Sequence, residues 1–312
     1  MKGLQNPMSI PDETPIKTEE RLAREFSAAR ARLIRIAYAV LGTQAEAEDV
    51  VSDCWFRLVK ANAQSPIDDV GAWTAVAVAR RALDALRAAQ VRRETYVGPW
   101  LPEPTLYDAD LTQDDPADRV TLDETVSFAL LVVMETLSPA QRTAWVLHDL
   151  FAMPFDDVAA VVGRTPAAVR QLAARARKHV AAGIPRVDVD RSSHLAVVDA
   201  FNNAMTSGDI DALLAILDPR VVLTSDGGGQ VTAARRPVAG AGKVARFVVG
   251  LGRKLAQELE VRIMAINGAP GIVMLRSGQL NAVVSLSVVE STISRVDILV
   301  SPTKLGHLHV DR

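Results

Sequence analysis

A short basic segment near the middle of the chain carries the side chains best suited to bind a polyanion. Residues 163–180 contain five cations and no acidic residue: Arg164, Arg170, Arg175, Arg177 and Lys178. On a helix, the outward positions between these cations hold Ala167, Gln171 and Ala174. Small residues on the outer face of a basic helix fit the major groove of DNA, and its cations meet the phosphates. The segment therefore predicts DNA binding, and the alternative is a solvated basic helix in an ordinary bundle.

Two helices and a tight turn must position this basic face. Apolar residues recur at helical spacing from Phe155 to Val162, which predicts a first helix. Gly163 suits the left-handed backbone conformation that ends a helix. Thr165 is a favourable N-cap and Pro166 a favourable first residue for the second helix. The spacing therefore predicts a helix-turn-helix over residues 153–180.

Earlier in the chain, two predicted helices carry opposite charge. Thr43 and Glu46 have the spacing of a capping box at the start of one helix. Near that start lie three further acids, where the helix dipole favours negative charge: Glu48, Asp49 and Asp53. The next helix, over about residues 70–91, is basic, and its cations include Arg80, Arg81 and Arg87. The acidic helix thus suits a protein partner and the basic helix a nucleic acid.

Composition limits the classes of protein that remain. The chain has 312 residues and a net charge of −2, so two or three domains are expected and nucleic-acid binding must come from local patches. Cys54 is the only cysteine, which argues against a disulfide framework or a cysteine-rich zinc site. The start of the chain is polar and lacks a signal-peptide pattern, and the apolar runs are too short to span a bilayer. We therefore expect a cytoplasmic protein without a cofactor or a metal.

Two Pro-containing segments divide the chain into parts. Residues 94–120 are rich in Pro and Asp and lack periodicity, which is typical of a linker. After a second linker the pattern changes to helices followed by short β-rich runs, which predicts an α+β domain with a curved antiparallel sheet. We expect these divisions: a disordered lead-in at 1–18, a helical domain at 19–93, linkers at 94–120 and 183–190, a helix-turn-helix domain at 121–182, and the α+β domain at 191–312.

Several motifs resemble those of the extracytoplasmic-function (group IV) sigma factors of the sigma-70 family. Residues 45–55 (AEAEDVVSDCW) resemble region 2.2 of that family, and residues 73–87 resemble regions 2.3 and 2.4. Region 4.2 is matched by residues 137–142 (LSPAQR), 155–159 (FDDVA) and 169–177 (VRQLAARAR). The resemblance covers about residues 20–182. It implies two all-α sigma domains, one a helical bundle and the other a helix-turn-helix.

Further motifs narrow the resemblance to the SigJ-like subgroup. They are residues 92–96 (RRETY), 100–104 (WLPEP) and 226–229 (DGGG). That subgroup carries a C-terminal SnoaL-like domain, a cone-shaped α+β fold. The chain departs from the pattern at residues 301–305, where SPTKL replaces Asn-Pro-Asp-Lys-Leu, and at Arg80, where many members have Asn. Base choice at the −10 element is therefore expected to differ.

The resemblance implies core RNA polymerase and promoter DNA as partners. It implies that Glu48, Asp49 and Asp53 contact core polymerase. It assigns the −10 element to Arg80, Arg81, Arg87 and the loop at residues 62–67, which would hold an unstacked base. It assigns the −35 element to Arg170, Gln171, Arg175 and Lys178. The fused domain would adjust the activity of the two sigma domains, with a small apolar ligand as a further partner to consider.

Two other functions compete with this interpretation. SnoaL-like folds include isomerases and cyclases. In this chain, however, every Tyr precedes residue 122, and no set of catalytic residues accompanies the polar candidates Asp199 and Asp226 in the sequence. We therefore expect no catalytic residues. The glycine motif at 226–229 predicts a turn or an interdomain contact, with an anion cradle as the alternative. The second competing function is a ligand-responsive helix-turn-helix regulator. Such a regulator binds DNA without polymerase and would not need the acidic helix.

Overall fold

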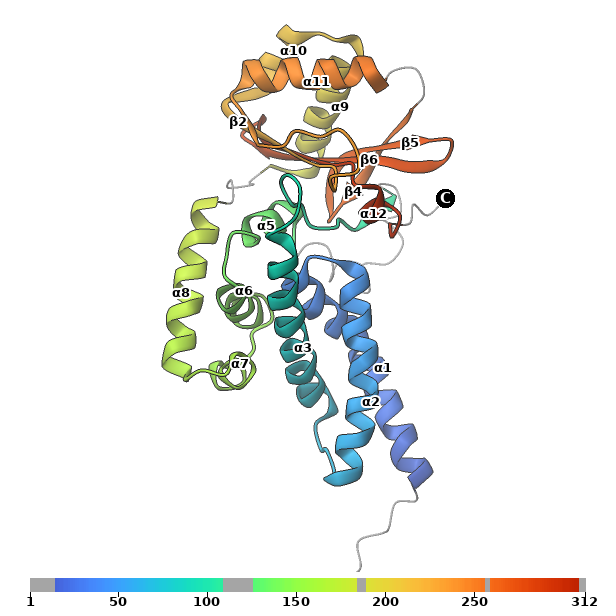
Figure 1. Ribbon diagram of the computed structural model, residues 1–312, viewed down its shortest axis with the longest axis vertical. Helices are drawn as coiled ribbons and strands as arrows, with labels where there is room; N and C mark the ends of the chain where they lie inside the picture. Colours follow the sequence, from blue (N-terminus) through green and yellow to red (C-terminus); the bar gives the residue numbers. More distant parts are fainter. Residues whose placement is uncertain (1–14, 109–125, 184–188, 256–258, 309–312) are drawn as a thin grey trace, which may run out of the picture.

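The computed structural model describes residues 15–108, 126–183, 189–255 and 259–308. Helices occupy the N-terminal half, and an α+β part lies against one end of them (Figure 1). The fold class predicted from the sequence is thereby confirmed. The first three helices are α1 (Pro15–Leu41), α2 (Gln44–Gln64) and α3 (Val70–Arg93).

These three helices pack against one another along their apolar faces. The helix α1 begins at Pro15, so the expected lead-in over residues 1–18 is wrong for residues 15–18, and residues 1–14 lie outside the described residues. Thr43 is the N-cap of α2, but its hydroxyl donates to the Glu46 carboxylate at 3.0 Å and makes no hydrogen bond to the backbone. The predicted capping box is therefore wrong, and a side-chain pair stands in its place.

The second group of helices holds the predicted helix-turn-helix. Its elements are α5 (Phe128–Met134), α6 (Pro139–Trp145), the π-helix η2 (Val146–Leu150), α7 (Phe155–Val162) and α8 (Pro166–Gly183). Ser138 and Gln141 form a complete capping box at the start of α6. The first described helix of the domain expected at 121–182 begins at Phe128, and residues 121–125 lie outside the described residues.

The C-terminal part combines helices with a seven-stranded sheet. The helices are α9 (Arg191–Ser207), α10 (Ile210–Ile216), α11 (Ala241–Leu255) and α12 (Pro302–Leu305). The strands are β1 (Leu106–Asp108), β2 (Leu217–Asp226), β3 (Val238–Ala239), β4 (Glu260–Ile266), β5 (Ala269–Arg276), β6 (Gln279–Val289) and β7 (Thr292–Leu299).

The strands follow the order β1-β4-β5-β6-β7-β2-β3. All neighbouring pairs are antiparallel except β2 and β7, which run parallel. The predicted antiparallel sheet is thus wrong in one pair, because β2 joins β7 only after a long crossover through α11 and the other strands.

The predicted linker at 94–120 is also only partly a linker. Residues 106–108 form strand β1, in which Leu106 pairs with Ile266 at the edge of the C-terminal sheet. This strand precedes the helix-turn-helix in sequence but belongs to the sheet that follows it. Residues 109–120 lie outside the described residues.

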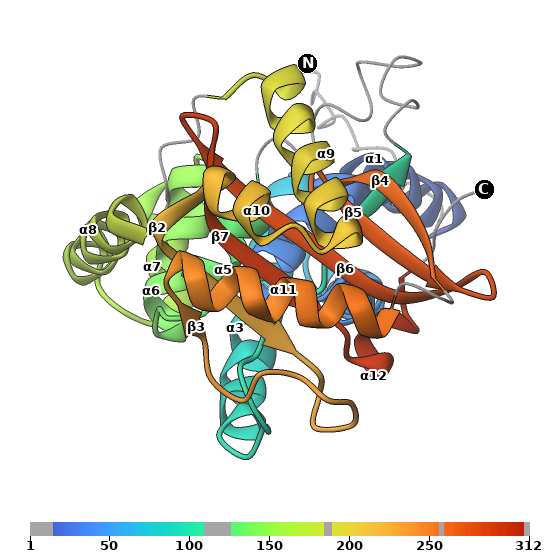
Figure 2. The ribbon, with the colours of Figure 1, turned by 90° about the horizontal axis from the view of Figure 1, so that it is seen from above.

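Each face of the sheet builds a different hydrophobic core. Ile272 and Met274 of β5 point to a core shared with α9 and α11, whereas Val273 and Leu275 point to the core of the helical part. This alternation follows from the two-residue period of a strand. Figure 2 shows α9, α10 and α11 over one face of the sheet, with the helical part behind the other. The α+β part is therefore packed onto both groups of helices.

Candidate nucleic-acid interface

The helix α8 presents the face that the sequence predicts for DNA. Arg170, Gln171, Arg175 and Lys178 are all exposed, and so are Ala167 and Ala174 between them. Gly163 has φ +71° and ends α7, and the Thr165 hydroxyl accepts a hydrogen bond from the Ala168 N–H at 3.3 Å. The predicted turn chemistry is confirmed, and it fixes the direction in which α8 leaves the turn.

Two arginines of this segment have partners inside the helix-turn-helix. The guanidinium of Arg177 lies 2.5 Å from the Asp149 carboxylate, which ties α8 to the end of η2. The guanidinium of Arg170 lies 5.2 Å from the centre of the Phe155 ring, within the range of a cation–π contact. Arg175 and Lys178 have no ion-pair or hydrogen-bond partner among the described residues. They remain free to meet phosphates or base edges.

The basic residues of α3, unlike Arg175 and Lys178, are bonded to other residues of the chain. Arg80 is exposed, but its guanidinium donates two hydrogen bonds to the Ala160 carbonyl of α7, at 2.9 and 3.2 Å. Arg81 faces Asp53 of α2 at 3.7 Å, and Arg87 pairs with Asp84 at 3.3 Å. The structure thus places all three predicted residues on one helix, each with a partner in the chain.

A hollow of about 520 Å³ lies at the loop between α2 and α3. Its lining includes residues 64–69 and the half-buried Trp73. The Asn62 carboxamide accepts the Ile67 N–H at 3.0 Å, and Arg21 of α1 donates to the Ile67 carbonyl at 3.3 Å. These bonds fix the loop in an open shape whose size suits a base.

A second hollow, of about 460 Å³, separates α3 from α7. It is lined by Ala72, Trp73, Val76, Ala77, Arg80 and Asp157. Trp73 is only half-buried because it borders both hollows. Trp55 of α2 lies against Phe26 of α1 with ring centres 5.4 Å apart.

The acidic residues predicted for polymerase lie on an open face of α2. Glu48, Asp49 and Asp53 are all exposed. Phe56 lies on the same stripe, seven residues after Asp49, and is 73% exposed. An exposed aromatic side chain beside acids is typical of a protein interface. Phe56 was not among the predicted contacts, although its position outside the apolar period of α2, between the buried Cys54 and Leu58, is a signal of its exposure.

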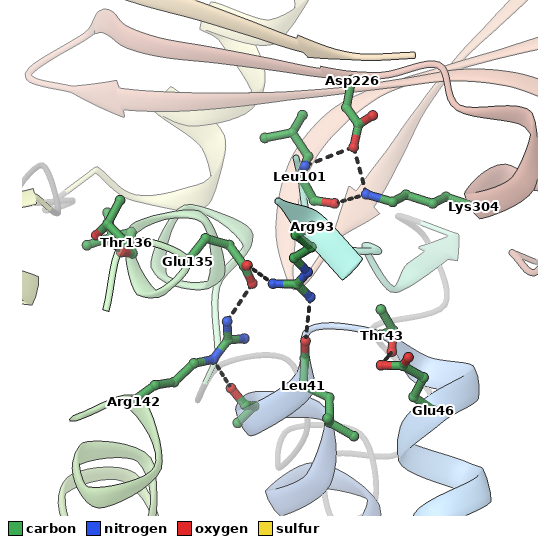
Figure 3. A network of polar contacts seen from close by, with 12 residues as sticks. Leu41, Thr43, Glu46, Arg93, Leu101, Glu135, Thr136, Arg142, Asp226 and Lys304 are labelled. Carbon is green, nitrogen blue, oxygen red and sulfur yellow. Dashed lines mark hydrogen bonds and ion pairs between the residues drawn. The ribbon is translucent and has the colours of Figure 1, made fainter. Parts of the chain in front are cut away.

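A buried network joins the two groups of helices. Glu135, at the end of α5, pairs with Arg93 at the end of α3 and with Arg142 of α6 at 2.5 Å (Figure 3). The two guanidiniums also donate to backbone carbonyls at the end of α1: Arg93 to Leu41 and Arg142 to Ala39. We call Arg93, Glu135 and Arg142 the arginine bridge. Since Arg142 is only 1% exposed, its charge depends on Glu135.

A second network joins the segment after α3 to the C-terminal part. The Asp226 carboxylate accepts hydrogen bonds from the Tyr96 hydroxyl at 2.5 Å and the Leu101 N–H at 2.9 Å. Lys304 of α12 pairs with the same carboxylate at 2.6 Å and donates to the Leu101 carbonyl (Figure 3). We call Tyr96, Leu101, Asp226 and Lys304 the clasp.

Burial sets the electrostatics of the clasp. It lowers the pKa of Lys304 to about 8, although the Asp226 carboxylate acts in the opposite direction. Burial and the hydrogen bond to Asp226 raise the pKa of Tyr96. The Lys304 ammonium lies 3.2 Å from the centre of the Trp100 ring, and Arg93 of the arginine bridge lies 4.1 Å from the same centre. Trp100 therefore connects the clasp to the arginine bridge.

The glycine motif belongs to this contact. The Gly228 N–H donates to Asp226 at 3.0 Å, and Gly228 has φ +64°. A Cβ at Gly228 would lie 2.6 Å from the Ser301 hydroxyl, so the tail and the glycine turn approach more closely than a side chain allows. The interdomain contact predicted for residues 226–229 is confirmed. The clasp itself was missed, because its members lie far apart in the sequence.

Within the described residues, no group of three or more His, Cys, Asp or Glu is placed to hold a metal ion. In the same part of the chain, no helix is long and apolar enough to cross a membrane.

Comparisons with known proteins support the observed fold. Residues 26–92 match the family Sigma-70 region 2, and residues 127–180 match Sigma-70, region 4. The ECF RNA polymerase sigma factor SigJ of Mycobacterium tuberculosis H37Rv is 45% identical over 228 residues, which are 73% of this chain and 72% of that protein. The probable ECF RNA polymerase sigma factor SigI of M. tuberculosis CDC 1551 is 33% identical over 92% of this chain and 95% of that protein. The crystal structure of M. tuberculosis SigJ is 35% identical, with a TM-score of 0.73, and the match covers 93% of this chain and 100% of that one.

Proposed function

The chain belongs to the extracytoplasmic-function sigma factors of the sigma-70 family and directs the initiation of transcription, and on that premise we propose how its surfaces divide the work. Sigma factors of this family bind core RNA polymerase and promoter DNA. The finer assignment of residues to these partners follows from exposure and charge.

The acidic stripe of α2 is the proposed contact with core polymerase. Glu48, Asp49 and Asp53 supply charge, and Phe56 supplies an apolar centre that is exposed in the free chain. Arg80, Arg81, Arg87 and the loop at 62–67 hold the −10 element, and the hollow beside Trp73 receives an unstacked base. Arg170, Gln171, Arg175 and Lys178 bind the −35 element.

The α+β part is the proposed regulator. The contact of Arg80 with Ala160 is the observation that carries this proposal, because it occupies a −10 residue with a carbonyl of the helix-turn-helix. The arginine bridge holds α3 beside α5 and α6, and the clasp fixes the intervening segment to the C-terminal sheet. Release of these contacts would free α3 for DNA.

We propose domain limits at 15–93, 121–182 and 191–312, and a cytoplasmic, non-catalytic role. The apolar ligand considered for the C-terminal part gains no support from the packing. Buried side chains such as Phe201, Leu213 and Leu286 occupy the space between its helices and the sheet.

Run-off transcription with purified core polymerase on a pool of promoters tests the assignment as a whole. The chain is expected to start transcription at discrete promoters, and a lack of core-dependent initiation on any promoter would contradict it.

The Phe56→Ser variant tests the polymerase contact. Loss of an exposed aromatic anchor is expected to weaken binding to core by about 1–3 kcal/mol, measured by fluorescence titration. Val91→Ser, which removes another exposed apolar side chain at 65% exposure outside the acidic stripe, is the matched control and should bind as the native chain does. Equal affinity of the Phe56→Ser variant and the native chain would exclude Phe56 from the interface.

A further inference from the structure

The outer face of α11 carries a row of cations that the assigned functions do not use. Lys243, Arg246 and Arg253 are exposed and lie on one side of the helix, at spacings of three and seven residues. We call these three residues the α11 face. The helix itself contains no acidic residue, so its charge is of one sign.

None of the three cations has an ion-pair or hydrogen-bond partner among the residues that the structure describes. Other exposed arginines of the same part are paired, such as Arg220 with Asp218 and Arg262 with Glu260. The α11 face thus shares its condition with Arg175 and Lys178 of α8, whose proposed ligand is DNA. A row of unpaired cations suits an external polyanion.

The shape of the face favours a phosphate backbone over a protein surface. Gly250 lies between Arg246 and Arg253 on the exposed side, and a Cβ at Gly250 would meet no atom within 4 Å. Where the structure describes the side chains of α11, the exposed positions hold no large apolar side chain of the kind that forms the centre of a protein interface. Lys243 and Arg253 are ten residues apart, which is about 15 Å along a helix and long enough to meet more than one phosphate.

The position of the face leaves it available. Helices α9, α10 and α11 cover the side of the sheet that faces away from the sigma helices (Figure 2). The apolar side of α11, with Val244 and Val248, is buried in the core it shares with the sheet, so the cations point outward.

We propose that the α11 face is a third DNA-binding surface, which binds the phosphate backbone of duplex DNA without sequence preference. It strengthens the complex with promoter fragments that extend beyond the −35 and −10 elements. This proposal adds to the function assigned above, and each can fail alone: loss of the face would leave promoter-specific initiation in place.

Salt dependence of DNA binding tests the proposal. The native chain, bound to core polymerase, is titrated with a long labelled promoter duplex at several KCl concentrations. Each phosphate contact contributes about 0.9 to the slope of log K against log salt. The Arg246→Gln, Arg253→Gln double variant should therefore reduce the slope by about two and lower the affinity at least tenfold at low salt. The double variant should lose as much affinity for a promoter duplex in which the DNA beyond the −35 and −10 elements has a scrambled sequence.

The matched control is Arg262→Gln, Arg276→Gln, which removes two exposed charges from β4 and β5 and should leave the slope unchanged. Gly250→Glu serves as a second variant, because Glu favours the helix more than Gly does but places an acid within the cations. It should bind DNA less tightly while its melting temperature stays equal or rises.

Three outcomes would overturn the proposal. An unchanged slope in the α11 variants would show that the face does not touch DNA. An equal loss in the control pair would show an effect of net charge alone. Weakened binding to core polymerase without DNA would identify an acidic protein surface as the partner.

Discussion

The basic faces of α3 and α8 differ in what their side chains contact within the free chain. Arg80 of α3 is bonded to the Ala160 carbonyl, whereas Arg175 and Lys178 of α8 have no partner among the described residues. In the observed arrangement the proposed −35 surface is therefore accessible, and the proposed −10 surface is partly occupied. The difference indicates an order of engagement, in which the upstream element is bound before α3 separates from α7.

The largest expected effect comes from substitutions in the clasp. The clasp fixes the arrangement in which the basic face of α3 is partly occupied while that of α8 is accessible. Lys304→Met leaves the Asp226 carboxylate, which is 0% exposed, without its counter-charge. Loss of one partner of a buried pair costs about 3–5 kcal/mol, so urea unfolding should show a fall of that size in the free energy of unfolding.

The same substitution should also change access to α3. With the clasp broken, a single-stranded −10 oligonucleotide should bind more tightly, while a −35 duplex binds as before. Asp226→Asn in the Lys304→Met background restores neutrality and should recover part of the lost stability. A loss below about 1 kcal/mol would mean that the clasp contributes little, since exposed ion pairs reach only that size.

A smaller effect is expected from single arginines of the two faces. Arg175→Ala should weaken binding of a −35 duplex by about 1–3 kcal/mol if the guanidinium contacts guanine. Arg80→Ala should leave binding of a −10 oligonucleotide to the free chain unchanged, and weaken it once core polymerase is bound. Electrophoretic mobility shifts with and without core measure both. Equal losses in the free chain would contradict the difference between α3 and α8.

Per pH unit, the smallest effect is a pH dependence that belongs to Lys304. The folded chain releases this proton near pH 8, whereas the unfolded chain holds it up to the ordinary value of 10.5. The unfolded chain therefore binds more protons between these limits, and stability rises with pH there by at most about 1.4 kcal/mol per unit. Unfolding at pH 8, 9 and 10 should show this rise in the native chain and not in Lys304→Met. Parallel curves for the two proteins would refute it.

What the sequence predicted well depends on local physical rules. Gly163, Thr165 and Pro166 act within one turn of the backbone, so the helix-turn-helix and the exposed face of α8 followed from spacing alone. The order of helices followed by β-rich runs in the C-terminal part was predicted for the same reason, whereas the short elements β3 and α12 were not predicted. The predicted disposition of Glu48, Asp49 and Asp53 on one exposed face is of this kind too.

What the sequence did not predict depends on contacts between distant residues. Arg80 and Ala160 are 80 positions apart, and Tyr96 meets Asp226 across 130. Strand β1 has three residues in a Pro-rich segment and exists because β4 offers an unpaired edge. Neither periodicity nor composition reports such pairings, so the arrangement of α3, α7 and the clasp required three-dimensional information.

The two-faced sheet has a consequence for how such a chain can evolve. Val273, Leu275 and Leu299 pack against the sigma helices in one shared hydrophobic core. The C-terminal domain therefore cannot be removed without exposing that core. Loss or exchange of this domain would expose apolar surface on both parts of the protein. Quality-control proteases would then degrade these parts. Replacement of the domain by a separate anti-sigma protein would first require polar substitutions at the apolar contact between the sheet and the sigma helices. The fusion is therefore difficult to reverse.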